Sequence, residues 1–132
     1  MIDAVALERE FARMISAIVG KPVDDGVFRG LMPETSNDAI CVRLTDDSVR
    51  FLETPEYTIQ VLGRFADRDD ALAFLSLMRQ SFPAFGRSIG GFSFPSIVPQ
   101  DAGVQPYTFS VRGNTMHFVS FNLRVRVLTS RA

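Results

Sequence analysis

The alternation of hydrophobic and polar residues changes abruptly in the stretch from 55 to 82. From Tyr57 to Phe65, apolar residues and one glycine alternate with mostly polar ones, which is typical of a strand with one buried face. Beyond this strand the apolar residues recur at helical spacing and form one stripe, made of Ala71, Phe74, Leu75, Met78 and Phe82. Asp67 is suited to begin this helix as its N-cap, and Pro83 to end it. The stretch predicts a strand that leads directly into an amphipathic helix, with Phe74 and Met78 packed under the strand.

A second amphipathic helix is expected over residues 2–19, because Gly20 and Pro22 follow it as a typical C-terminal signal. Its apolar face is predicted to consist of Leu7, Phe11, Met14, Ile15 and Ile18. Its polar face is predicted to consist of Glu8, Arg9, Glu10, Arg13 and Ser16.

Shorter alternating runs predict strands at Val27–Leu31, Ala39–Thr45 and 107–112. Residues 45–53 are interpreted as a polar connection, and the glycines and prolines of 84–106 predict irregular strands, bulges and loops. The clearest alternation lies in the last strand, whose apolar face is His117, Val119, Phe121, Leu123, Val125 and Val127. We therefore expect a single α+β domain over 1–132, with a mainly antiparallel sheet and both helices on one face.

Composition narrows the class of protein. The chain has 132 residues, 46% of them hydrophobic and 12 of them Phe, which argues for one folded domain and against disorder. Its formal net charge of −1 provides no overall positive field for nucleic acid. A single cysteine, Cys41, excludes an internal disulfide and leaves the redox compartment undecided. We find no signal peptide and no apolar run that would span a bilayer, so no membrane partner is expected.

Candidate chemistry is sparse. The only histidine, His117, lies on the apolar face of its strand, and Cys41 has no histidine that can be paired with it. Three aspartates at 67, 69 and 70 do not have the spacing of a calcium loop and are explained more simply by helix capping. Gly90-Gly91 lacks the Lys-Ser/Thr of a phosphate loop. We therefore expect no catalytic residues, no metal and no cofactor, and we expect that the protein is not an enzyme.

Arginines form the remaining candidate surface. Arg124 and Arg126 share the polar face of the last strand, which is either a solvated sheet face or a surface for nucleic acid or an acidic protein neighbour. Arg64, just before the helix cap, either pairs with Asp67 or faces an exposed surface used by a partner.

Three stretches resemble the phage minor capsid and tail-terminator proteins, at matching relative positions. VFRGLMPETSNDAICV is similar to that family's strand, turn and following strand. The strand–helix junction is similar through Gln60, Val61, Arg64, Asp67 and Ala71. A later loop and its strands are similar through Pro95, Asp101, Gly103 and Asn122.

The resemblance implies a structural virion protein of the phage neck, assembled in the host cytoplasm. Such proteins form a ring, usually a homohexamer, that terminates the tail tube and joins it to the head connector or head completion protein; DNA would pass through transiently. The interface candidates are Arg64, Asp67 and Asp101, which lie in the resembling stretches, and Arg124 and Arg126, which form the arginine face of the last strand. The chain would then present loops 45–54 and 96–106 that become ordered only in the ring.

Two alternatives remain open from the sequence. One is a small oligomeric ligand-binding or regulatory α+β protein, with the Phe-rich region 82–94 lining a pocket. The other is a weak nucleic-acid binder that uses the arginine face.

Overall fold

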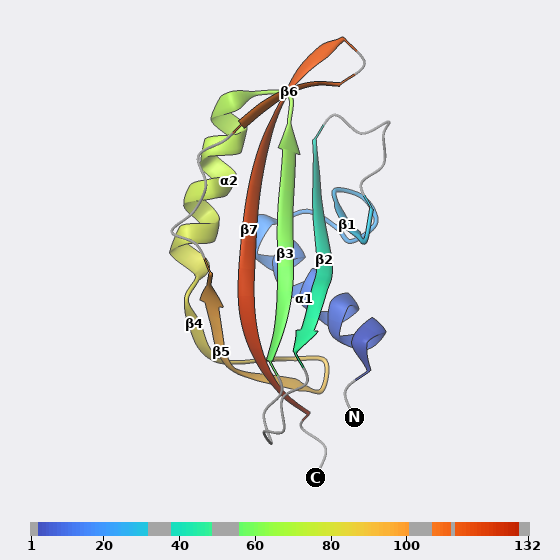
Figure 1. Cartoon of the computed structure of the whole chain (residues 1–132), viewed down its shortest axis with the longest axis vertical. Helices are drawn as coiled ribbons and strands as arrows, with labels where there is room; N and C mark the ends of the chain where they lie inside the picture. Colours follow the sequence, from blue (N-terminus) through green and yellow to red (C-terminus); the bar gives the residue numbers. More distant parts are fainter. Residues whose placement is uncertain (1–2, 32–37, 49–55, 101–106, 112, 130–132) are drawn as a thin grey trace.

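A computed structural model describes residues 3–31, 38–48, 56–100, 107–111 and 113–129 (Figure 1). In chain order the elements are α1 (Ala4–Val19), β1 (Val27–Arg29), β2 (Ala39–Ser48), β3 (Glu56–Phe65), α2 (Arg68–Ser81), β4 (Ala84–Ile89), β5 (Phe92–Pro99), β6 (Tyr107–Val111) and β7 (Asn114–Thr129). The central strand and the helix after it are thus confirmed.

Within the described residues, seven strands form one sheet in the order β1-β2-β3-β7-β5-β4, with β6 paired to β7. All pairings are antiparallel except that of β1 with β2. The long β7 pairs with β3 from Glu56 opposite Arg126 to Phe65 opposite His117, and the two strands run side by side through the molecule (Figure 1). The predicted α+β class with a mainly antiparallel sheet is confirmed.

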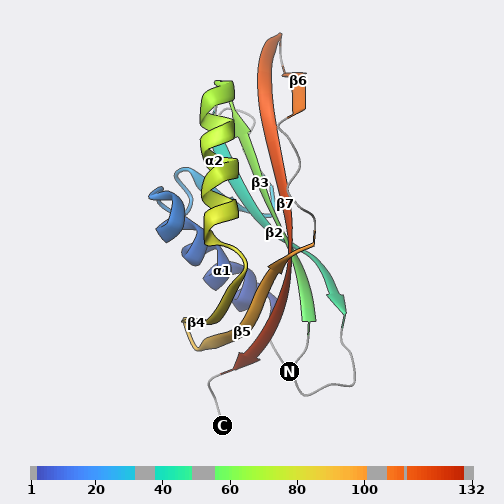
Figure 2. The same cartoon turned by 90° about the vertical axis from the view of Figure 1, so that its left-hand side faces the viewer.

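Both helices cover the same face of the sheet, as predicted, and the opposite face carries no described helix (Figure 2). One buried cluster joins the helix stripes to the inward residues of β2, β3, β5 and β7. Phe74 and Met78 belong to this cluster together with Ile59 and Val61, so the predicted burial of the α2 stripe is confirmed. Gly63 lets Phe74 approach β3, because a Cβ there would lie 2.9 Å from the Phe74 ring.

Side chains fix where the two helices begin. The Asp67 carboxylate accepts a hydrogen bond of 2.9 Å from the backbone N–H of Asp69, so the predicted N-cap of α2 is confirmed. Asp3 caps α1 in the same way by accepting from the Val5 and Ala6 N–H groups. Gly20 ends α1 in the left-handed conformation with φ of 73°, which glycine adopts without steric cost.

Several predicted boundaries are wrong. β2 continues to Ser48, so residues 45–48 form strand and not a connection, because they pair with the first half of β3. The predicted irregular strands of 84–106 are confirmed over Ala84–Pro99, where β5 has a register shift between Ser93 and Ser96. These residues pair as a two-stranded hairpin, β4–β5, closed at Gly90 and Gly91 with positive φ. Of the segments 45–54 and 96–106, which we expect to become ordered only in a ring, residues 45–48 and 96–100 are described and form hydrogen-bonded strand or strand-end structure in the single chain. Residues 49–54 and 101–106 lie outside the described residues, and the dependence of order on assembly stays a prediction.

The predicted polar face of α1 is wrong at Glu10, which is only 6% exposed. The turn of the β4–β5 hairpin lies against this side of α1, and a Cβ at Gly90 would lie 2.2 Å from the Glu10 carboxylate. Arg13 compensates the buried charge through a 3.1 Å contact. The helix pattern alone could not reveal this cover, because it comes from a hairpin about 80 residues further along the chain.

Candidate interaction surface

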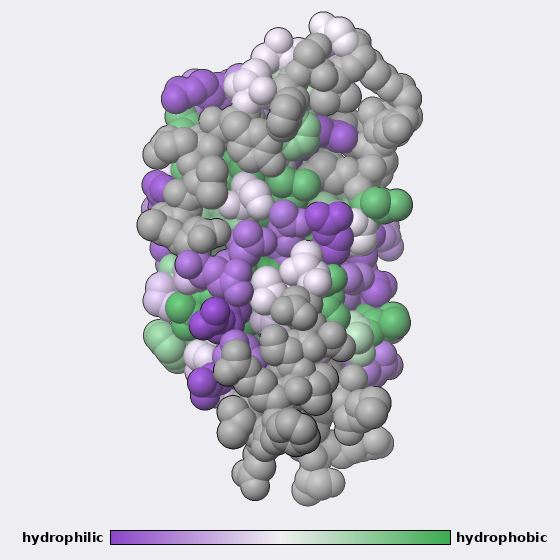
Figure 3. All heavy atoms as spheres, in the orientation of Figure 1, coloured by the Kyte–Doolittle hydropathy of each residue, from purple (hydrophilic) through white to green (hydrophobic). Residues whose placement is uncertain are grey.

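The face of the sheet opposite the helices has no described helix over it, and we call it the open face. Strand alternation creates it: the residues of β7 that alternate with the buried Val119–Val127 series point outward here. Figure 3 views this face and shows a band of hydrophilic residues across it, with hydrophobic residues at its sides. The open face is therefore mixed in polarity, as are the surfaces of non-obligate protein interfaces.

An ion-pair cluster occupies the open face near one end of β3 and β7. The Glu56 carboxylate lies 3.2 Å from Nε of Arg124 and 3.7 Å from Nε of Arg126. Both arginine side chains remain more than half exposed, at 57% and 54%, whereas the Glu56 side chain is 19% exposed. One carboxylate thus orients two guanidinium groups, and the cluster retains a net positive charge of one.

Hydrogen-bonded side chains fix the middle of the open face. Arg43 of β2 donates to the Gln60 side-chain oxygen, and the Gln60 amide donates to Oγ of Ser120 at 3.1 Å. Gln100 donates to Oγ1 of Thr58 at 3.2 Å. This network crosses β2, β3 and β7, so these side chains are held in position before any partner binds, which lowers the ordering cost of binding.

Exposed apolar side chains flank the ion-pair cluster. Phe85, Val98 and Leu128 are 67%, 39% and 38% exposed. Strand register aligns them with the arginines: Phe85 lies opposite Ser96, which lies opposite Arg126, and Val98 lies opposite Arg124. The open-face patch, as we define it, comprises Glu56, Phe85, Val98, Arg124, Arg126 and Leu128. Aromatic and arginine side chains are enriched at protein–protein contacts, so this patch has the composition of an interface.

The structure brings together two of the five predicted interface residues, Arg124 and Arg126. Arg64 lies near the opposite end of β3, where it is only 7% exposed, so the expectation that it faces an exposed surface is wrong. The alternation of β3 predicts an outward side chain at this position, but the last three residues of the strand are all buried. Asp67 is exposed, and its carboxylate caps α2 on the helix side. Asp101 lies outside the described residues.

Sequence reasoning missed Glu56 and the three apolar members of the open-face patch. Leu128 could have been found, because it continues the outward positions of the last strand after Arg126. Phe85 and Val98 could not, because a register shift between Ser93 and Ser96 interrupts the alternation of β5, and Gly86 has a positive φ of 67°.

The residues considered for chemistry have ordinary environments. Cys41 is buried, and burial raises the pKa of its thiol, while Arg43 opposes and Glu8 adds to that shift. His117 lies opposite Phe65, with Nδ1 at 3.4 Å from Oγ1 of Thr108. In the part of the chain that the structure describes, no group of three or more His, Cys, Asp or Glu side chains is placed to hold a metal ion. Neither α1 nor α2 is long and apolar enough to cross a membrane.

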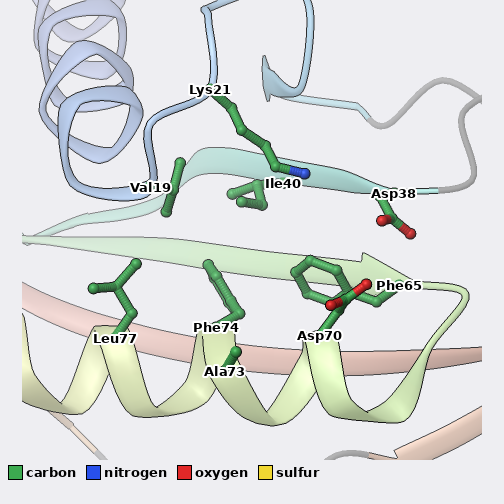
Figure 4. A pocket seen from close by; sticks show the side chains of 9 residues that line it. All are labelled: Val19, Lys21, Asp38, Ile40, Phe65, Asp70, Ala73, Phe74 and Leu77. Atoms are coloured by element: carbon green, nitrogen blue, oxygen red, sulfur yellow. The ribbon is translucent and has the colours of Figure 1, made fainter.

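A cavity of about 270 Å³ opens on the helix side, between α2 and the segment that follows α1 (Figure 4). It is lined by Val19, Lys21, Asp38, Ile40, Phe65, Asp70, Ala73, Phe74 and Leu77. The prediction that the Phe-rich region 82–94 lines a pocket is wrong for this cavity. Three phenylalanines of that region belong to the buried core, and Phe85 is exposed on the open face.

Comparison with known proteins shows a similar fold in a solved structure and no significant match in sequence. No family model matches the chain, and no curated protein matches it significantly. Among solved structures, the chain is similar to a chain from the "Virion of native gene transfer agent (GTA) particle", with a TM-score of 0.50 and 14% identity. The similarity covers 95% of this chain and 85% of that chain. The two therefore share their architecture along almost the whole length of this domain.

Proposed function

We propose that this chain is a structural protein of a phage-like particle, and that its copies form a ring that terminates the tail tube and joins it to the head connector. The observation that carries the proposal is the open-face patch, in which preoriented arginines lie beside exposed apolar side chains. The fold shared with a chain of a gene transfer agent virion and the motif resemblance to tail-terminator proteins support the phage-like context. The protein would act by binding alone, without catalysis.

A ring places a specific demand on each subunit. In a ring, each subunit is related to the next by a rotation, so one surface of each chain contacts a different surface of its neighbour. The domain has two unlike sides, one formed by the helices and the other by the open face of the sheet, and these offer two such surfaces (Figure 2). We assign the open-face patch to the contact with an adjacent copy. The tail tube protein and the head connector would bind the two opposite rims of the ring.

The same proposal allows a second orientation of the subunit, in which the open face with its arginines lines the central channel of the ring. Arg124 and Arg126 would then recur once per subunit and form bands of positive charge around passing DNA, with weak and salt-sensitive contacts.

Replacing both arginines tests the proposal. The double variant R124A/R126A should fold normally, because exposed ion pairs contribute only about 0–1 kcal/mol each to stability. R68A/R79A is the matched control, since it removes the same charge from exposed α2 positions that do not line the cavity on the helix side. The assay combines sedimentation velocity with electron microscopy of tails assembled in the presence of each variant.

If R124A/R126A forms no rings and leaves tails uncapped, while the control variant forms rings and caps tails, the contact between copies is supported. Capped tails that fail to pass DNA support the channel position. Normal rings, capping and DNA passage overturn both assignments of the arginines.

A further inference from the structure

The cavity on the helix side has the size of a socket for one side chain. Its volume of about 270 Å³ lies below the range of about 300–1,000 Å³ that is usual for small-molecule sites. Its deepest walls are apolar: Ile40, Phe65 and Phe74 are at most 4% exposed, and the two rings lie 5.4 Å apart between centroids. An aromatic ring would find both apolar cover and ring edges to contact in such a socket.

Charged groups surround the mouth of the cavity. Figure 4 shows the carboxylates of Asp38 and Asp70 and the ammonium group of Lys21 arranged around it. One oxygen of Asp38 accepts the backbone N–H of Ala66 at 3.0 Å. Two carboxylates and one ammonium group give the mouth a net negative charge, so the fitting occupant is an aromatic side chain accompanied by a cation.

This chain carries such a group on β4. Among the side chains that the structure describes, Phe85 is the exposed aromatic one, at 67% exposure. Arg87 is also exposed and lies two residues further along the strand, about 7 Å away. Gly86 between them has a positive φ of 67°, which breaks the regular alternation of the edge strand.

Phe85 cannot reach the cavity of its own chain. Asp70 and Ala73 line the cavity from the first turns of α2, whereas β4 begins beyond the end of this helix, whose 14 residues span about 21 Å. Phe85 also belongs to the open face, and the cavity opens among the helices.

We propose that Phe85 of one copy inserts into the cavity of the next copy, with Arg87 beside Asp38 and Asp70. The contact joins two different surfaces, the β4 edge and the α1–α2 side, and therefore repeats from copy to copy. The inference rests on the proposed ring and names the residues that link its subunits.

Two single variants remove opposite halves of the contact. Phe85→Ser removes the inserted ring, and Ala73→Trp, at an exposed position of α2, fills the mouth of the cavity. Leu31→Ser and Ala17→Trp are the matched controls, because both positions are exposed and neither lines the cavity. Each test variant should need at least about a tenfold higher concentration to assemble than the wild type, and the controls should not.

Mixing the two test variants gives the sharpest result. Phe85→Ser keeps its cavity and Ala73→Trp keeps its phenylalanine, so one intact contact forms per pair and the mixture should stop at heterodimers. If Ala73→Trp does not fold by circular dichroism, Asp70→Arg tests the same mouth, and its assembly should be restored in trans by Arg87→Asp.

The outcomes separate the contact from the ring. If the wild type forms rings and both variants form the same rings, the contact is overturned and the proposed function stands. Open oligomers of the wild type that both variants abolish support the contact and overturn the ring. A wild type that stays monomeric at all concentrations and on tail tubes overturns both.

Discussion

Truncating Phe74 to alanine tests how α2 is held to the sheet. The ring is 4% exposed, lies against Gly63 and contacts Phe65. Buried Phe→Ala changes cost about 3–5 kcal/mol. Because Phe74 already borders a cavity that is open to water, the deletion enlarges an accessible space and leaves no sealed void. We therefore expect a loss of about 3 kcal/mol in the free energy of unfolding, at the lower end of that range.

Gly63→Ala examines the same contact from the strand. The added Cβ would lie 2.6 Å from the Phe65 ring and 2.9 Å from the Phe74 ring, so we expect a cost of about 1–3 kcal/mol from overpacking. In a Phe74→Ala background part of that clash disappears. The double variant should therefore be less destabilised than the sum of the single variants by at least about 0.5 kcal/mol.

Urea unfolding followed by far-ultraviolet circular dichroism, at a fixed protein concentration, measures all three variants. Val5→Ala is the control, because Val5 is 61% exposed and its truncation should change the free energy by less than about 0.5 kcal/mol. A loss below about 1 kcal/mol for Phe74→Ala, or strict additivity with Gly63→Ala, would refute the packing described here.

Three further predictions concern single side chains. Asp67→Ala should cost about 1 kcal/mol in chemical denaturation through loss of the α2 N-cap, and Asp69→Ala clearly less; equal losses would contradict the capping role. Glu8→Ala should cost about 1–3 kcal/mol, because Glu8 accepts the Leu44 N–H at 3.0 Å and pairs with Arg29; Glu8→Gln retains an acceptor and should lose less. Burial raises the pKa of the Cys41 thiol, so its neutral form contributes stability that is fully present below the unfolded-state pKa and is lost as pH rises through the folded-state pKa. Alkylation at neutral pH should accordingly be slow in the native protein and fast in urea, and equal rates would contradict the burial.

Much of the fold was predictable because its longest elements have strong periodicity. The alternation of β7 and the helical stripe of α2 each identify one buried face, and two such faces determine which side of the sheet the helices cover. The β4–β5 hairpin was not predictable in this way. Gly86 and the register shift in β5 interrupt its alternation, so the glycines and prolines predicted irregular strands and bulges but not the pairing of these strands as a hairpin.

The candidate surface was predictable only in part, because exposure depends on neighbouring strands. Arg124 and Arg126 follow from the period of their own strand, whereas Glu56 joins them only through the register of β3 against β7. Glu10 and Arg64 are polar residues at positions that local patterns place on the surface, and both are buried in the folded chain. Long-range contacts of this kind leave no signal within one helix or one strand.

Electron microscopy of tail tubes incubated with the purified chain tests the central claim most directly. The account predicts a closed ring of this protein at the tube end, about six copies by mass, that stops further tube growth and is lost with R124A/R126A. Tubes that keep growing with no added density at their ends, while the chain remains a monomer or dimer, would contradict it.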